Sequence, residues 1–172
     1  MLILVSGGSG SGKSAFAEGL IAACPAAPRI YIATMQIWDE ECRQRVRRHR
    51  AMRADKGFCT HECPRDLETL QVPAGSAVLL EDLSNLTANE CFGGSAQGAE
   101  GRILAGVSAL QKTAGLTVIV TNELFSDGLT YDAETEAYLS MLAGLNCAIA
   151  AKADRVYEVV CGIPVCHKGE EK

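Results

Sequence analysis

The most informative stretch of this chain is residues 2–14, Leu2-Ile3-Leu4-Val5-Ser6-Gly7-Gly8-Ser9-Gly10-Ser11-Gly12-Lys13-Ser14, from which the fold can be predicted. The four apolar residues predict a buried strand, and the glycines that follow predict a tight loop. The segment from Gly7 to Ser14 matches G-x-x-x-x-G-K-[ST], a pattern in which backbone N–H groups surround nucleotide phosphates. We therefore predict that a nucleotide binds to Gly7, Gly8, Ser9, Gly10, Ser11, Gly12, Lys13 and Ser14.

The last two residues of this loop have distinct predicted roles. Lys13 is expected to reach the β- and γ-phosphates, and the hydroxyl of Ser14 is expected to bind Mg²⁺. The helix that begins here points its N-terminal N–H groups and its dipole toward the anion. A flexible linker of glycine and serine is the alternative, but the apolar strand before the loop and the helical pattern of residues 15–21 argue against it.

Length and composition predict one domain, residues 1–172, of a globular and cytoplasmic protein. Hydrophobic residues make up 48% of the chain and charged residues 22%, as in ordinary soluble domains. The net charge of −5 argues against a general nucleic-acid binder. No apolar run approaches the roughly 20 residues that cross a bilayer, and the first apolar segment has no basic leader, so we expect neither a membrane span nor a signal peptide.

The chain has eight cysteines, which we expect to be free thiols in a reducing compartment. A disulfide scaffold is the alternative, but it does not fit a nucleotide-binding enzyme. The segments 59–63 and 161–167 could together supply zinc ligands, although neither has the C-x-x-C spacing of a zinc knuckle. A metal site made by these segments is therefore not expected.

Strands and helices alternate along the chain. We predict strands at 2–5, 29–34, 77–80, 116–120 and, as the last strand, 155–160. We predict helices at 14–24, 39–52, 100–113 and 133–151. Between and after these elements we expect a mostly irregular stretch at 53–75, a surface loop at 93–98 and a frayed tail at 169–172. Such alternation predicts an α/β fold like that of phosphate-loop NTPases, with a mostly parallel sheet and helices on both faces. Ligands bind beyond the carboxyl ends of such strands, where Gly7, Thr34, Glu81 and Asn122 would lie.

An apolar strand that ends in two acids, Val78-Leu79-Leu80-Glu81-Asp82, is typical of the carboxylate that serves the Mg²⁺ ion beside a phosphate loop. Glu81 directly follows the apolar run, whereas Asp82 has the more usual residue type. The pattern leaves both open. As an alternative role, Asp82 or Ser84 fits the N-cap of a short helix.

Residues 42–53 hold six arginines and His49 in an otherwise acidic chain. On a helix, the spacing places Arg45, His49 and Arg53 on one face. Guanidinium groups neutralise phosphate oxygens, and their field keeps a neighbouring imidazole neutral and nucleophilic. A solvated basic face with an uninvolved histidine is the alternative that the charge pattern alone favours.

Several motifs together resemble a known family. These are the phosphate loop, Tyr31-Ile32-Ala33-Thr34, Arg45-Val46-x-x-His49-Arg50-x-x-Arg53, Thr60-x-Glu62, Leu79-Leu80-Glu81, Asn89, Val120-Thr121-Asn122-Glu123, Ala153-Asp154-x-Val156 and Gly162-Ile163-Pro164-Val165. The chain resembles the bifunctional adenosylcobinamide kinase / adenosylcobinamide-phosphate guanylyltransferase family over nearly its full length. It differs from the family pattern at 124–130, at Ser140 and Ala143, and at Ala54, which bears on corrinoid binding and on the kinase activity.

The resemblance implies specific roles for residues of this chain. His49 is expected to be the guanylylated and hence catalytic histidine, with Lys13 as the second catalytic residue, and nucleotide contacts are expected at residues 7–14, Thr34, Arg50, Arg53, Glu62 and Glu81. Ser14 and Glu81 are expected to serve the metal, Mg²⁺, while GTP and ATP act as substrates. A corrinoid is the expected acceptor, and a homotrimer is the expected assembly.

Two other functions remain open from the sequence. One is a different small-molecule kinase on the same fold, in which His49 would be incidental. The other is a regulatory nucleotide-binding module, although the chain lacks the Asn-Lys-x-Asp motif with which GTPase switches recognise guanine.

Overall fold

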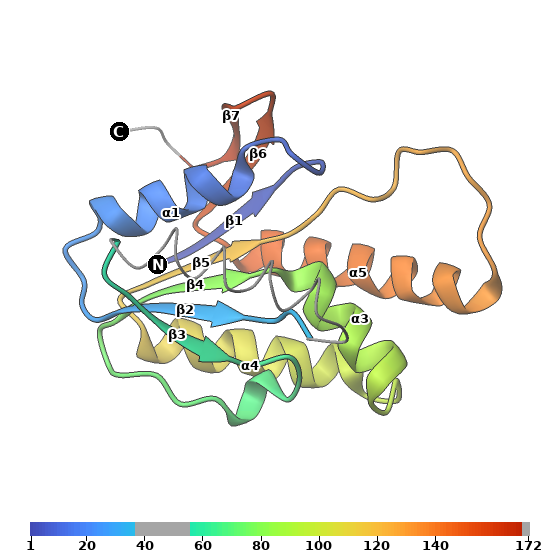
Figure 1. Ribbon diagram of the computed structural model, residues 1–172, viewed down its shortest axis with the longest axis horizontal. Helices are drawn as coiled ribbons and strands as arrows, with labels where there is room; N and C mark the ends of the chain where they lie inside the picture. Colours follow the sequence, from blue (N-terminus) through green and yellow to red (C-terminus); the bar gives the residue numbers. More distant parts are fainter. Residues whose placement is uncertain (37–55, 170–172) are drawn as a thin grey trace.

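The strand before the phosphate loop lies inside a mostly parallel sheet (Figure 1). The computed structural model describes residues 1–36 and 56–169, and within these ranges the sheet has the strand order β3-β2-β4-β5-β1-β6-β7. The strands are β1 (Leu2–Ser6), β2 (Arg29–Ala33), β3 (Phe58–Glu62), β4 (Ala77–Glu81), β5 (Leu116–Val120), β6 (Arg155–Val160) and β7 (Ile163–Lys168). All neighbouring pairs are parallel except β6 and β7.

Helices cover both faces of the sheet, as predicted. Helix α1 (Lys13–Ala23) lies on one face, and α3 (Leu83–Gly93), α4 (Ala99–Thr113) and α5 (Ala133–Lys152) lie on the other (Figure 1). Each face of the sheet has its own hydrophobic core. Alternate residues of β1 pack into one core or the other, because successive side chains of a strand point to opposite faces. Ile3 and Val5 belong to the cluster with α1, whereas Leu2 and Leu4 belong to the cluster with the other three helices.

One prediction about the ends of the sheet is wrong, and one strand was not predicted. The described part of 53–75 is mostly irregular, as predicted, but the unpredicted strand β3 and the 3-10 helix η1 (Leu67–Thr69) lie within it. Strand β6 is not the last strand, because β7 follows it and pairs with it in an antiparallel hairpin. Both missed strands are edge strands. Polar residues end the apolar pattern of β3 after two residues, and the short apolar run of β7 is exposed and contains Pro164, which argues against a strand.

Helix α3 is longer than the short helix that the sequence offered as an alternative role for Asp82. It begins directly after β4, and the side chain of Asp82 caps it by accepting a hydrogen bond from the backbone N–H of Asn85 (2.6 Å). The helix predicted at 39–52 lies outside the described residues. The other helices begin and end within a few residues of their predicted bounds.

Candidate active site

The phosphate loop connects β1 to α1, and three of its glycines are required by a close contact or by the backbone conformation. A Cβ atom on Gly7 would lie 2.6 Å from the carbonyl oxygen of Val159 and 2.7 Å from Ser11 Oγ. Gly10 and Gly12 have φ angles of 71° and 92°, in the left-handed region that favours glycine. Helix α1 starts at Lys13, so its first N–H groups face the space in which the loop would hold an anion.

Segments distant in the sequence hold this loop on two sides. The N–H of Gly162, in the turn of the β6–β7 hairpin, donates to the carbonyl of Ser11 (2.8 Å). The N–H of Glu123, just after β5, donates to the carbonyl of Gly7 (3.1 Å). The Lys13 side chain is buried, and its Nζ donates to the carbonyl of Gly8 (3.0 Å), so the cation lies over the loop. The motif alone gave no signal for the two distant contacts.

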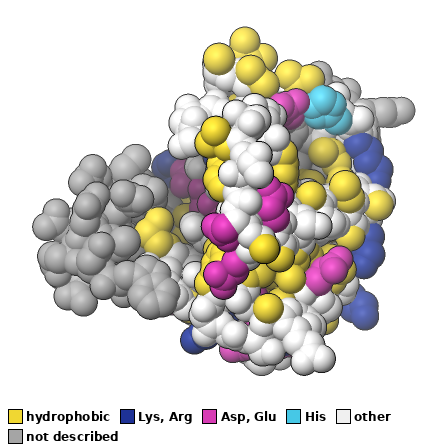
Figure 2. All heavy atoms as spheres, turned by 90° about the vertical axis from the view of Figure 1, so that its right-hand side faces the viewer, with side chains coloured by type: hydrophobic (Ala, Val, Ile, Leu, Met, Phe, Trp, Pro, Cys, Tyr) yellow, Lys and Arg dark blue, Asp and Glu magenta, His cyan; other side chains and the backbone are white. Residues whose placement is uncertain are grey.

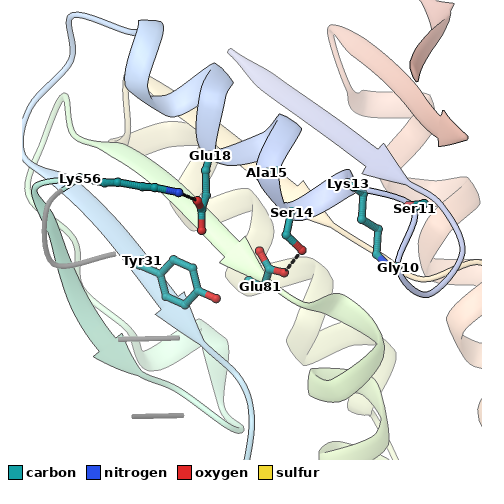
Figure 3. A pocket seen from close by; sticks show the side chains of 10 residues that line it. Gly10, Ser11, Lys13, Ser14, Ala15, Glu18, Tyr31, Lys56 and Glu81 are labelled. Atoms are coloured by element: carbon teal, nitrogen blue, oxygen red, sulfur yellow. Dashed lines mark hydrogen bonds and ion pairs between the residues drawn. The ribbon is translucent and has the colours of Figure 1, made fainter. Parts of the chain in front are cut away.

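Glu81 meets Ser14 at the edge of the loop (Figure 3). The Ser14 hydroxyl donates a hydrogen bond to Glu81 Oε1, which joins the start of α1 to the end of β4. A hydroxyl and a carboxylate are the hard oxygen ligands that Mg²⁺ prefers. The residue types and their juxtaposition therefore fit a magnesium ion at the phosphate loop.

Asp82, the other candidate for the metal, is engaged elsewhere. Its Oδ1 accepts hydrogen bonds from the Asn85 N–H (2.6 Å) and from Ser84 Oγ (2.9 Å), and its Oδ2 accepts one from Asn122 Nδ2 (3.0 Å). These bonds direct the carboxylate toward α3 and the end of β5. The peptide bond between Glu81 and Asp82 is cis. Of the two acids, only Glu81 is brought to Ser14 by a described hydrogen bond.

Thr34 follows β2 and has a completely buried side chain. Its Oγ1 lies 3.1 Å from the Glu81 carbonyl oxygen and 2.9 Å from that of Asp82, and it accepts a hydrogen bond from the Asp82 N–H (2.8 Å). Asn89 of α3 donates to the Thr34 carbonyl (2.7 Å). Thr34 thus holds the ends of β2 and β4 together, and its direct contact with a nucleotide stays a prediction.

A cavity of about 370 Å³ extends from the phosphate loop along α1. Its lining runs from the loop and Glu81 to Tyr31 and to the ion pair between Lys56 and Glu18 (Figure 3). This volume lies within the range of small-molecule sites. Glu62 lies at the carboxyl end of β3, and the structure does not place it in this lining.

Three predicted site residues, His49, Arg50 and Arg53, lie outside the described residues. The two segments considered for zinc lie on strands at opposite edges of the sheet, with Cys59 on β3 and Cys166 and His167 on β7. Within 1–36 and 56–169, no group of three possible metal ligands comes together, and the cysteines have free thiols. No helix in the same ranges is long and apolar enough to cross a membrane.

Solved structures with low sequence identity share this fold. The flagellar accessory protein FlaH of Methanocaldococcus jannaschii superposes with a TM-score of 0.51 at 11% identity, over 98% of this chain and 78% of that chain. An ATPase from the type III secretion system of pathogenic bacteria gives a TM-score of 0.55 at 11% identity, over 91% of this chain and 51% of that one. These likenesses confirm the predicted fold class.

Sequence comparison identifies nearer relatives. The bifunctional adenosylcobalamin biosynthesis protein CobU of Salmonella typhimurium is 35% identical, over 96% of this chain and 98% of its own length. The CobP protein of Pseudomonas aeruginosa, which carries the same description, is 31% identical, over 97% of both chains. The family model described as cobinamide kinase / cobinamide phosphate guanyltransferase matches residues 3–166. The chain therefore belongs to the cobinamide kinase / cobinamide phosphate guanyltransferase family.

Proposed function

We propose that this protein phosphorylates adenosylcobinamide with ATP or GTP and then transfers GMP from GTP to adenosylcobinamide phosphate, as part of cobalamin biosynthesis. Membership of the family supports both activities. The observation that carries the proposal is the phosphate loop, in which the buried Lys13 lies over the loop and Ser14 meets Glu81.

The kinase step follows from this geometry. The N–H groups of the loop and the Lys13 cation would hold the β- and γ-phosphates, so that a hydroxyl of the acceptor attacks the γ-phosphorus and the bond to the β-phosphate oxygen breaks. A magnesium ion, held by Ser14 and served by Glu81, would offset negative charge on these phosphates. Nearly all of this catalysis is positioning and charge stabilisation, which a rigid loop anchored by Gly162 and Glu123 provides.

The transfer step requires a nucleophile, which we assign to His49. An imidazole nitrogen would attack the α-phosphorus of GTP, and pyrophosphate would leave with the electrons of the broken P–O bond. A phosphate oxygen of the phosphorylated acceptor would then attack the same phosphorus and release His49. Arg50 and Arg53 would neutralise charge on the phosphates, and Glu62 and Thr34 would add nucleotide contacts. These assignments rest on the sequence motifs.

We further propose one domain over residues 1–172, a cytoplasmic location and a homotrimer. The single sheet that runs through the described residues supports one domain. The free thiols of the described cysteines suit a reducing compartment, where ATP and GTP are also available. The resemblance to the family supports the trimer, and light scattering on the purified protein would test it.

Labelling with GTP tests the proposed function. Protein incubated with α-labelled GTP should acquire an acid-labile, base-stable adduct, which mass spectrometry should place on His49. His49→Ala should lose the adduct and keep part of the kinase activity. Lys13→Ala should lose both activities by at least about 100-fold, because the cation over the phosphates is removed, while circular dichroism shows a folded protein.

The same experiment separates the alternatives. A different small-molecule kinase would hydrolyse or transfer the γ-phosphate without forming an adduct, and a regulatory module would bind GTP and do neither. An adduct on His61, or product formation without any adduct, would show that the nucleophile is misplaced.

A further inference from the structure

A groove lies between the loop that follows β5 and the first half of α5. It consists of two hollows of about 390 Å³ and 280 Å³. Both are lined by Leu124, Asp127, Tyr131 and Leu139, so they are two parts of one feature, which we call the α5 groove. Its other lining residues come from 123–129 and from 135–143.

The α5 groove is placed next to the candidate active site. Its loop starts at Glu123, whose N–H donates to the carbonyl of Gly7 in the phosphate loop (3.1 Å) and whose side chain lines the groove. Asn122, one residue earlier, donates to Asp82, which follows Glu81 (3.0 Å). In Figure 1 this loop arches away from the carboxyl ends of the strands toward the start of α5. A ligand in the groove would therefore lie beside the phosphate end of the nucleotide site.

The lining of the groove is acidic and apolar. Three carboxylates, of Glu123, Asp127 and Glu136, line it, and among the lining residues that the structure describes there is no lysine, arginine or histidine. Three of its apolar side chains are unusually open to solvent, with exposed fractions of 37% for Leu124, 44% for Phe125 and 65% for Leu129. Figure 2 views the molecule from this side, and acidic and apolar side chains gather over the middle of the face while basic ones lie at its margin.

Hydrogen bonds hold the acidic side chains of the groove in place. Asp127 accepts hydrogen bonds from the Tyr131 hydroxyl and from the Leu129 N–H (3.0 Å). These bonds lower the pKa of Asp127, because they stabilise its ionised form. Glu136 accepts from the Tyr131 N–H (3.2 Å). The loop thus presents fixed negative charge together with apolar surface.

We propose that the α5 groove binds the corrinoid acceptor, an inference that rests on the proposed function. A cobalt(III) corrinoid with a carbanionic deoxyadenosyl ligand has a single net positive charge, a broad apolar ring and many peripheral amide N–H donors. Each property matches the groove, because carboxylates attract the charge and accept from amides, and exposed leucine and phenylalanine contact the ring. A second nucleotide fits less well, since the three carboxylates would repel its phosphates and no described lining residue offers a cation.

Binding of adenosylcobinamide to charge-reversal variants tests this assignment. Glu136→Lys should raise the Kd for adenosylcobinamide about tenfold, because it replaces an attraction by a repulsion inside the groove. Glu134→Lys is the matched control, since Glu134 is also exposed on the first turn of α5 but does not line the groove. Leu129→Ser should weaken binding by a similar factor through loss of apolar contact without a change of charge. GTP binding and adduct formation should stay unchanged in all three variants.

Hydrogen exchange provides a readout that does not depend on variants. Peptides covering 123–131 should become protected in the wild-type protein on addition of adenosylcobinamide, and not on addition of GTP alone. Equal affinity of wild type, Glu136→Lys and Leu129→Ser, with no protection of 123–131, would overturn the groove assignment while leaving the proposed function standing. A wild-type protein that forms the GTP adduct but binds no adenosylcobinamide would overturn both.

Discussion

The adjacent acids Glu81 and Asp82 have different hydrogen-bond partners in the structure. Both follow the same buried strand, and the residue types alone leave either as the partner of the metal. The structure separates them, because Glu81 accepts from Ser14 while Asp82 accepts from Asn85 and Asn122. We therefore expect Asp82 to contribute mainly to stability, and Glu81 to contribute to the chemistry.

Matched amide substitutions test this division. Glu81→Gln should lower the Mg²⁺-dependent kinase rate by about 100-fold and leave the melting temperature nearly unchanged, because the side chain keeps its size but loses its charge. Asp82→Asn should keep most activity, since asparagine also caps helices well. Asp82→Ala should lower the free energy of unfolding by about 1–2 kcal/mol through loss of the cap.

Magnesium titrations of the rate and urea unfolding curves provide the two measurements. If Asp82→Asn is the more damaging change for the rate and Glu81→Gln is tolerated, the metal assignment is reversed.

On the face of the sheet that α3, α4 and α5 cover, one buried acid, Glu90 of α3, connects several elements. Its side chain is 2% exposed, and it accepts from the N–H of Asp66 (2.8 Å) and forms an ion pair with Arg102 of α4. Arg102 also donates to the Ser95 carbonyl in the α3–α4 loop (2.7 Å). Glu90 therefore joins the segment after β3 to both helices, which keeps α3 in place behind Asp82.

Removal of this acid should destabilise the protein. Glu90→Ala leaves the Arg102 guanidinium and the Asp66 N–H without their partner, so the free energy of unfolding should fall by about 3 kcal/mol. Glu100→Ala is the control, because Glu100 is an exposed acid in the first turn of α4, where its loss should cost no more than about 0.5 kcal/mol. Chemical denaturation measures both, and equal losses in the two variants would refute a special role for Glu90.

Two groups in the larger core link the stability of the whole molecule to alkaline pH. Burial raises the pKa of the Cys63 thiol from 9.0 to about 11, with a further contribution from the charge of Asp66. Burial likewise raises the pKa of Tyr138 from 10.0 to about 12, assisted by Asp82. In both cases the folded protein retains the proton more strongly than the unfolded chain, so the stability contribution is complete at neutral pH.

This contribution should be lost as the pH rises. The unfolded chain releases the Cys63 proton near pH 9 and the Tyr138 proton near pH 10, whereas the folded protein keeps them, so the free energy of unfolding should fall between pH 9 and about 11 to 12. The double variant Cys63→Ala/Tyr138→Phe cannot release these protons and should show a shallower decline. Urea unfolding at a series of pH values measures the slope, and identical slopes for the two proteins would contradict the linkage.

The phosphate loop, the central strands β1, β2, β4 and β5, and hence the fold class, could be predicted from local sequence patterns. Each of these depends on residues that are adjacent in the chain, such as the glycines before Lys13 or the apolar run that ends at Leu80. The edge strands β3 and β7 were missed because an exposed edge of a sheet tolerates polar residues, as in β3, and a proline, such as Pro164 in β7.

Which acid accepts a hydrogen bond from Ser14, and which segments are hydrogen-bonded to the phosphate loop, depends on tertiary contacts. Strand β5 lies between β1 and β4, so Asn122 reaches Asp82 and Glu123 reaches Gly7, while the β6–β7 turn brings Gly162 to Ser11. No local pattern encodes these contacts, because they join residues that only the order of strands in the sheet brings together. The α5 groove arises in the same way, since its two walls meet only when the loop after β5 folds back along α5.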